Sequence, residues 1–170
     1  MIATPQELFA HRLRSTLWIE QTLVDEILPT MGGHVHSIDL KYAIEHHTFE
    51  TQHHVRTLQS VLHRLGESAE AEPSPALLGL RADHDAMMNR IDLSRHDVVD
   101  LMHGEMIAAT EHHEMAVYES LVATANALGE EEIATMLEEI REQEEHALEV
   151  VTRATAKLLA EKVESLRLDA

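Results

Sequence analysis

Residues 38–66 read IDLKYAIEHHTFETQHHVRTLQSVLHRLG, and this stretch decides the fold class. Its apolar residues recur at the spacing of one helix face, as Leu40, Ile44, Leu58, Val61 and Leu65. Such a period predicts a long amphipathic helix whose apolar side faces a core. Ser37 is the expected N-cap, and Gly66 is expected to end the helix just after Leu65. We therefore expect a helix over approximately 38–65.

Working outward, the same pattern recurs on both sides of this helix. Thr4 and Glu7 form an expected capping box around Pro5, and Pro29 with the following glycine pair is expected to end the first helix. A polar linker over 67–75 and a tight turn at Gly129 separate the remaining helical segments. The other expected helices cover approximately 5–29, 76–90, 95–128 and 130–164. Two helical hairpins joined by a long crossover with a short helix predict an all-α, ferritin-like four-helix bundle, as a single domain over 1–170.

Composition narrows the function classes. The 13 basic and 31 acidic residues give a net charge of −18, which disfavours binding to nucleic acids or to anionic membranes. No apolar run approaches the ~20 residues needed to span a bilayer, and the N-terminus lacks the order of a signal peptide. We expect a cytoplasmic protein. The absence of cysteine excludes disulfides, thiolate metal sites and cysteine nucleophiles.

Charged and imidazole side chains interrupt the apolar side of all four long helices. At about 100° per residue, these side chains point toward the core: Glu20, His47, Glu50, His54, Glu111, Glu114 and Glu144. An isolated ion in a core costs several kcal/mol, so these residues are expected to act together. The histidines that point elsewhere are expected at or near the surface: His46, His53, His112, His113 and His146.

These residues are also expected to lie at the same level along the bundle axis. Glu114 and Glu144 lie fifteen residues before and after Gly129, so in an antiparallel hairpin they meet at one level, about 22 Å from the turn. Measured from Gly33, Glu20 lies thirteen residues before the turn and His47 fourteen after it. All four helices are therefore expected to deliver side chains to one layer.

Carboxylates with imidazoles suit a dinuclear site for two Fe ions, with Mn or Zn as alternatives. The general di-iron pattern has a lone Glu on two helices and Glu-x-x-His on the other two. The chain matches it only in part, because Ala147 stands where the fourth helix would carry a histidine. We expect Glu50, Glu111 or Glu144 to bridge the two ions. Tyr118, one turn from Glu114, is the candidate catalytic residue, as a hydrogen-bond donor or radical relay, with plain packing as its alternative role.

The chain resembles the YciE/YciF-like stress-associated proteins, bacterial members of the ferritin-like superfamily, over about residues 4–160. The resemblance rests on PQELFAHRLRSTLWIEQTLVDEILPTM, HHTFETQHHVRTLQSVLHRLGE, ATEHHEMAVYESL and ALGEEEIATMLEEIREQEEHALEVV. It implies a ferritin-like bundle, often a homodimer, with ferroxidase or related dioxygen or peroxide chemistry. The chain departs from the family at His113, often Tyr, and at Leu148, often acidic. The second departure thins the ligand set on the last helix.

Two other functions stay open. One is a metal-free helical module that acts by association, which would keep its stability when chelated. The other is a haemerythrin-like oxygen or metal carrier, suggested by His46, His47 and Glu50. That second class needs inward histidines on most helices, and the first and fourth helices offer none.

Overall fold

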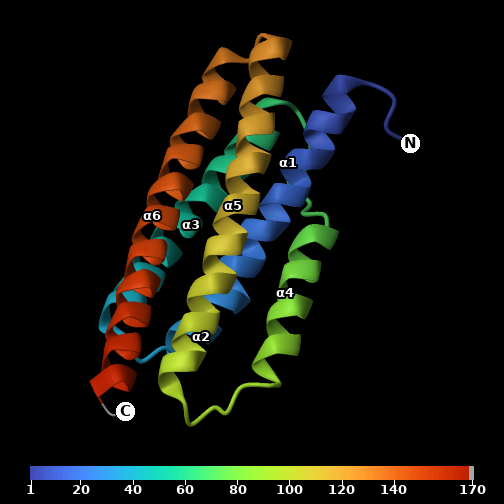
Figure 1. Ribbon diagram of the computed structural model, residues 1–170. Helices are drawn as coiled ribbons and strands as arrows, with labels where there is room; N and C mark the ends of the chain where they lie inside the picture. Colours follow the sequence, from blue (N-terminus) through green and yellow to red (C-terminus); the bar gives the residue numbers. More distant parts are fainter. Residues whose placement is uncertain (169–170) are drawn as a thin grey trace.

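The computed structural model describes residues 1–168 and is built from helices (Figure 1). Four long segments form the bundle: α1 (Pro5–Thr22), α3 (Ile38–Arg64), α5 (His96–Leu128) and α6 (Glu131–Leu168). A π-helical turn, η1 (Leu23–Ile27), and α2 (Leu28–His34) continue α1, and α4 (Pro75–Met88) lies in the crossover. This is the all-helical, ferritin-like arrangement that the sequence predicts.

Helix ends follow the expected local chemistry with one exception. Thr4 and Glu7 form the capping box, the Ser37 side chain accepts from the amide of Leu40, and Gly129 has a left-handed φ of 79°. The exception is Pro29, which does not end the first helix. The wide π turn just before it shifts the hydrogen bonds, so that the amide of Leu28 bonds the carbonyl of Leu23. A bulge of this kind accommodates a proline that would otherwise break the helix.

Two apolar clusters fill the bundle, one on each side of a polar layer. The first contains Leu13, Leu17, Leu58, Leu121 and Leu137. The second contains Leu23, Ile44, Ile107, Met106 and Val151. On α3, α5 and α6 the residues between the two clusters are the predicted carboxylates and histidines. Dry packing on both sides therefore holds the polar layer in place and keeps water from most of it.

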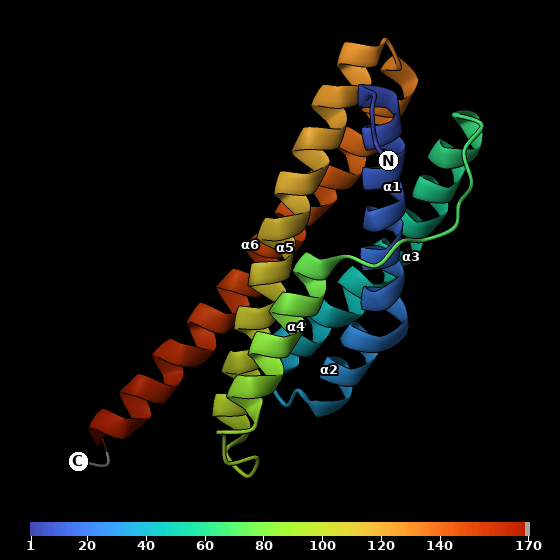
Figure 2. The same cartoon turned by 90° about the vertical axis from the view of Figure 1, so that its right-hand side faces the viewer.

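The short helix α4 packs on α5 outside the four-helix core (Figure 2). Helix α5 approaches α6 closely at Gly104, where an added Cβ would clash with Thr155. The last turns of α6 extend beyond the other helices, as Figure 2 shows. No helix within residues 1–168 is long and apolar enough to cross a membrane.

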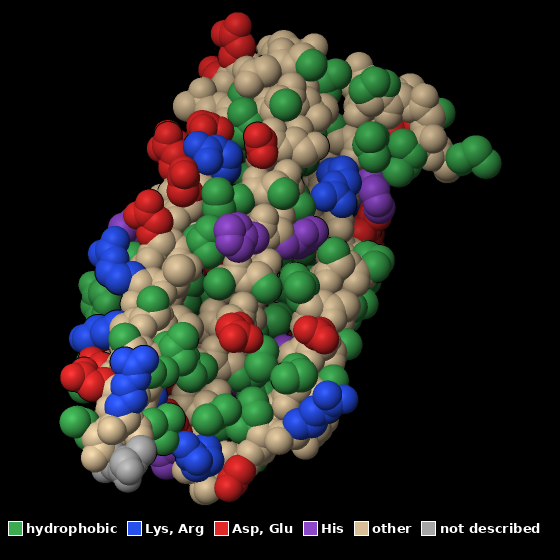
Figure 3. All heavy atoms as spheres, viewed as in Figure 1, with side chains coloured by type: hydrophobic (Ala, Val, Ile, Leu, Met, Phe, Trp, Pro, Cys, Tyr) green, Lys and Arg blue, Asp and Glu red, His purple; other side chains and the backbone are tan. Residues whose placement is uncertain are grey.

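Acidic side chains gather over the first half of α6, in the upper part of the view in Figure 3. Exposed carboxylates of this segment include Glu131, Glu132, Glu139, Glu142 and Glu145. They give this end of the molecule a negative field that attracts cations.

Candidate metal centre

All four long helices contribute to the polar layer. Six of the seven predicted ligands are at most 3% exposed: Glu20, His47, His54, Glu111, Glu114 and Glu144. The seventh, Glu50, is half-buried, with 14% of its side chain exposed. The sequence phase of each helix thus predicts which side chains point inward.

The buried ligands fall into two groups that share one carboxylate. Within each group, potential ligand atoms lie within 4.8 Å of one another. The first group contains His47, Glu111, Glu114 and Glu144, and the second contains Glu20, His54 and Glu144. Glu144 is therefore the one carboxylate common to both groups.

Charge pairs hold the layer together in the protein alone. His47 Nε2 lies 3.1 Å from Glu111 Oε1, and its Nδ1 lies 3.8 Å from Glu144 Oε2. His54 Nδ1 lies 3.0 Å from Glu144 Oε1 and 3.3 Å from Glu20 Oε2. Each imidazole thus faces carboxylates from other helices, as a ligand set for a cation would.

The proton balance of the layer reflects both burial and these pairs. Burial lowers the pKa of His47 and of His54, but the neighbouring carboxylates outweigh it, raising the pKa of His47 well above its usual value and that of His54 to about 11. Burial, reinforced by neighbouring carboxylates, raises the pKa of Glu144 to about 8 and that of Glu114 well above its usual value. Near neutral pH, protons therefore occupy the positions that metal ions would take.

Nine buried atoms of the seven residues have no hydrogen-bond partner: Glu20 Oε2, His47 Nδ1, Glu50 Oε2, His54 Nδ1, Glu111 Oε2, both carboxylate oxygens of Glu114 and both of Glu144. Buried polar atoms are normally satisfied, and each orphan costs about 1–3 kcal/mol. Oxygen and imidazole nitrogen atoms in this number and proximity match the preferences of Fe, Mn and Zn. The residues present therefore fit bound transition-metal ions.

Three further side chains support the ligands. The Tyr118 hydroxyl, fully buried, donates to Glu20, and burial raises the pKa of this tyrosine well above its usual value. Gln143 Oε1 lies 2.8 Å from His54 Nε2, and the Thr51 hydroxyl lies 3.4 Å from His47 Nε2. Sequence reasoning singled out Tyr118 but missed the other two. The one available signal was position, since Gln143 adjoins Glu144 and Thr51 lies one turn after His47.

Glu50 stands apart from the two groups. Its Oε2 lies 3.9 Å from His47 Nδ1 and 3.2 Å from Nδ1 of the exposed His46. Burial raises its pKa, but the two nearby imidazoles outweigh this and lower the pKa below its usual value. Of the three bridging candidates, Glu144 is the one shared by both groups, while Glu50 lies at the rim of the layer.

The other predicted histidines lie at the surface or close to it. Four are exposed, namely His46, His53, His112 and His146, and His113 is half-buried. A buried histidine pair lies outside the layer, with His84 Nε2 3.1 Å from His103 Nδ1. Burial, with the charges of neighbouring histidines, lowers the pKa of His103 to about 4.

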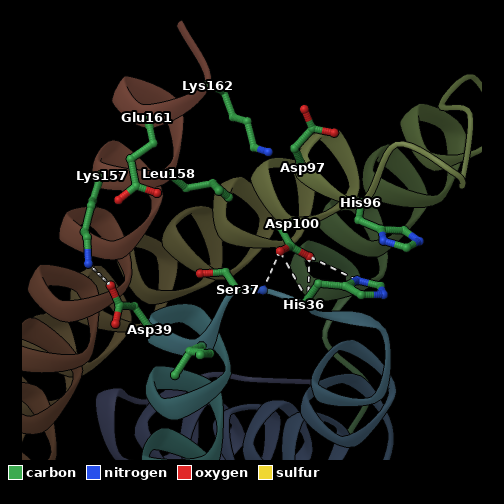
Figure 4. Close-up of a pocket in the computed structure, with 11 residues that line it drawn as sticks. His36, Ser37, Asp39, His96, Asp97, Asp100, Lys157, Leu158, Glu161 and Lys162 are labelled. Carbon is green, nitrogen blue, oxygen red and sulfur yellow. Dashed lines mark hydrogen bonds and ion pairs between the residues drawn. The ribbon is translucent and has the colours of Figure 1, made fainter. Parts of the chain in front are cut away.

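A separate groove of about 490 Å³ lies between the start of α5, the α2–α3 connection and the end of α6 (Figure 4). Its buried carboxylate, Asp100, accepts from the backbone amides of His36 at 3.0 Å and of Ser37 at 2.7 Å. Lys157 pairs with Asp39 across the groove at 2.6 Å. Because these carboxylates already have partners, this groove lacks the orphaned ligand atoms of the polar layer.

Comparison with solved structures finds the same fold in three bacterial proteins. YcfI, described as a putative structural protein from Rhodopseudomonas palustris, is 30% identical, with 92% of this chain and 94% of that chain covered and a TM-score of 0.75. The E. coli stress protein YciF is 21% identical, with coverages of 94% and 99% and a TM-score of 0.85. A Xanthomonas campestris pv. campestris protein is 22% identical, with coverages of 96% and 99% and a TM-score of 0.74.

The comparison of sequences is narrower. No curated protein matches the chain. One family model matches residues 4–164, almost the whole of the described structure. The chain therefore belongs to the family described as a domain of unknown function, DUF892.

Proposed function

We propose that this chain is a dinuclear metal protein, most suitably di-iron, that oxidises Fe(II) with dioxygen or peroxide. The observation that carries the proposal is the set of nine orphaned ligand atoms in one buried layer. A stable core would not keep so many unpaired carboxylate and imidazole atoms without a cation to satisfy them.

The chain's residues bind, orient and exclude water. Tyr118 fixes the Glu20 carboxylate, and Gln143 fixes the ring of His54. Partners of this kind behind a ligand hold its orientation and tune its basicity. The apolar clusters on both sides keep the layer dry. When bound, a pair of Fe(II) ions would supply the two electrons that an oxidant such as peroxide accepts.

The protons held by the polar layer also bear on cation binding. Glu144 holds a proton near neutral pH because burial and neighbouring carboxylates raise its pKa to about 8, and the same effects raise the pKa of Glu114. Cation binding would displace these protons from the layer. The Tyr118 hydroxyl donates a hydrogen bond to Glu20 and thereby orients that carboxylate within the layer.

A metal-free structural role is the alternative, and the description of the Rhodopseudomonas palustris relative YcfI as a putative structural protein favours it. The orphaned atoms weigh against it, because an association module does not need buried ligand atoms that lack hydrogen-bond partners. The haemerythrin-like carrier is supported less, since the two imidazoles in the layer, His47 and His54, both come from α3.

Homodimer formation and the use of dioxygen or peroxide are likewise proposals, and both follow from the family resemblance. The cytoplasmic location stays a prediction.

Anaerobic loading with Fe(II), followed by air or peroxide, tests the function. We expect a near-ultraviolet ferric absorption band to develop in the wild type and to be lost in Glu111→Ala. His112→Ala is the matched control, because it changes the exposed neighbour of Glu111. A wild type that binds no iron, or an equal band in Glu111→Ala, would refute the proposal and leave the metal-free module.

A further inference from the structure

A small hollow between α3 and α6 connects the surface with the polar layer. Its volume is about 90 Å³, which is room for roughly three water molecules. The residues that matter in its lining are Tyr42, His46, His47, Glu50, His146 and Ala147. Two of these, His47 and Glu50, belong to the predicted ligand set, so the hollow ends at the candidate centre.

Glu50 stands between the outer and the inner end of this hollow. Its Oε2 lies 3.2 Å from Nδ1 of His46, whose side chain is 51% exposed. The same oxygen lies 3.9 Å from Nδ1 of His47, whose side chain is 4% exposed. This Oε2 atom is buried and has no hydrogen-bond partner. The carboxylate is therefore in reach of both an exposed and a buried imidazole while satisfied by neither.

Ala147 leaves the inner wall of the hollow open. It is the residue three positions after Glu144, where the general di-iron pattern places a histidine ligand. Here the side chain is a single methyl group that lines the hollow. An imidazole at this position would fill space next to the layer, whereas alanine leaves that space to solvent and to incoming ions.

The outer end combines two exposed imidazoles, from His46 and His146, with the Glu50 carboxylate. Imidazole with carboxylate favours Fe(II), Co(II) or Zn(II) over Mg²⁺ and Ca²⁺, which prefer oxygen alone. The acidic first half of α6 leads up to the residues at this mouth and raises the local concentration of cations.

We infer that this hollow is the port through which a divalent transition-metal ion reaches the centre, with His46, His146 and Glu50 as its successive transient ligands. The inference rests on the proposed function and assigns its metal-delivery route. Glu50 is then the carboxylate that binds the ion after His46 and His146 and transfers it to His47. This role explains why Glu50 lies at the rim of the layer and outside both buried groups.

Stopped-flow uptake of Co(II) by the full chain tests the port without any catalytic readout. The visible absorption of bound Co(II) reports both the rate and the final amount bound. For His46→Ala/His146→Ala we expect uptake about tenfold slower, because two imidazole nitrogens that would bind the entering ion are lost, with the same final amount. Ala147→Leu narrows the hollow and is expected to slow uptake at least as much.

His53→Ala/His112→Ala is the matched control, since it removes two exposed imidazoles that do not line the hollow. Uptake by the double variant of His46 and His146 at the control's rate would overturn the port, and so would fast uptake by Ala147→Leu. If Ala147→Leu also loses binding capacity, the rate of the histidine variant decides, because both of its changes lie at exposed positions. A wild type that takes up no Co(II) would instead overturn the proposed function together with the port.

Discussion

Replacing Glu144 by glutamine should stabilise the metal-free protein while it weakens metal binding. Glu144 is fully buried, and burial with the charges of Glu111 and Glu20 raises its pKa to about 8. In the unfolded chain the same carboxyl ionises near its usual pKa of 4.5. Below that value both states hold the proton. As pH rises above it the unfolded chain ionises first, so this group lowers the free energy of unfolding until pH passes about 8.

The size of the effect follows from that interval. One pKa unit corresponds to ~1.4 kcal/mol, so between the usual pKa and pH 7 Glu144 destabilises the fold by about 3 kcal/mol. Glutamine keeps the shape and removes this contribution. It also replaces the 3.0 Å contact between the Glu144 carboxyl and His54 Nδ1 by a weaker contact with an amide, which costs about 1–2 kcal/mol. The net gain at pH 7 is about 1–2 kcal/mol, or a rise in Tm of roughly 2–8 °C for a chain of this size.

Urea unfolding with a chelator present, followed by circular dichroism at pH 5 and pH 7, measures this gain. Glu149→Gln is the matched control, because Glu149 lies on the exposed side of the same helix, and it should change stability by no more than about 0.5 kcal/mol. At pH 5 Glu144 destabilises the fold by less than about 1 kcal/mol, so the advantage of Glu144→Gln should disappear there. A variant less stable than the wild type at pH 7, or an advantage equal at both pH values, would refute the reasoning.

Three further predictions concern the layer and the helix packing around it. Metal affinity should rise from pH 6 to pH 8, and binding should release protons, because the pKa values of His54 (about 11) and Glu144 (about 8) keep both groups protonated at pH 7. Calorimetry in buffers of different ionisation enthalpy measures the number of protons released. An affinity that does not change with pH would contradict this prediction. Tyr118→Phe removes the donor to a buried carboxylate and should cost about 1–3 kcal/mol in urea unfolding without changing metal stoichiometry; an unchanged unfolding midpoint would argue against that hydrogen bond. Gly104→Ala should lower the free energy of unfolding by about 1–3 kcal/mol, because the added methyl group clashes with Thr155 where α5 packs on α6. Adding Thr155→Ala should restore part of this stability. An unchanged free energy of unfolding in Gly104→Ala would show that the two helices can move apart at no cost.

Most of the fold was predictable because helix phase and turn position are local properties. The fifteen-residue spacings on either side of Gly129 place Glu114 and Glu144 at one level, and both are fully buried in the structure. The continuation of the first helix past Pro29 was not predictable in the same way. It depends on a π turn over Leu23–Ile27, and the hydrogen-bond shift that makes this turn has no signature in residue type.

The candidate metal centre was likewise predictable only in part. The 100° periodicity predicts which side chains point inward. It does not predict the rotation of each helix about its own axis to better than a few tens of degrees. Glu50 follows His47 by three residues and could be interpreted equally as a ligand or as a rim residue. Gln143 reaches His54 only through the packing of α6 on α3, which is a tertiary property. The sharing of Glu144 between both ligand groups is tertiary for the same reason.

The most direct test of the central claim is the number of Fe(II) ions bound per chain under strictly anaerobic conditions, by equilibrium titration with metal analysis. The wild type should bind about two. Glu20→Gln should impair one of the two positions, whereas Glu144→Gln should weaken both, because Glu144 alone belongs to both ligand groups. A wild type that binds no Fe(II), or a Glu144→Gln protein that binds as the wild type does, would contradict a dinuclear centre in this layer.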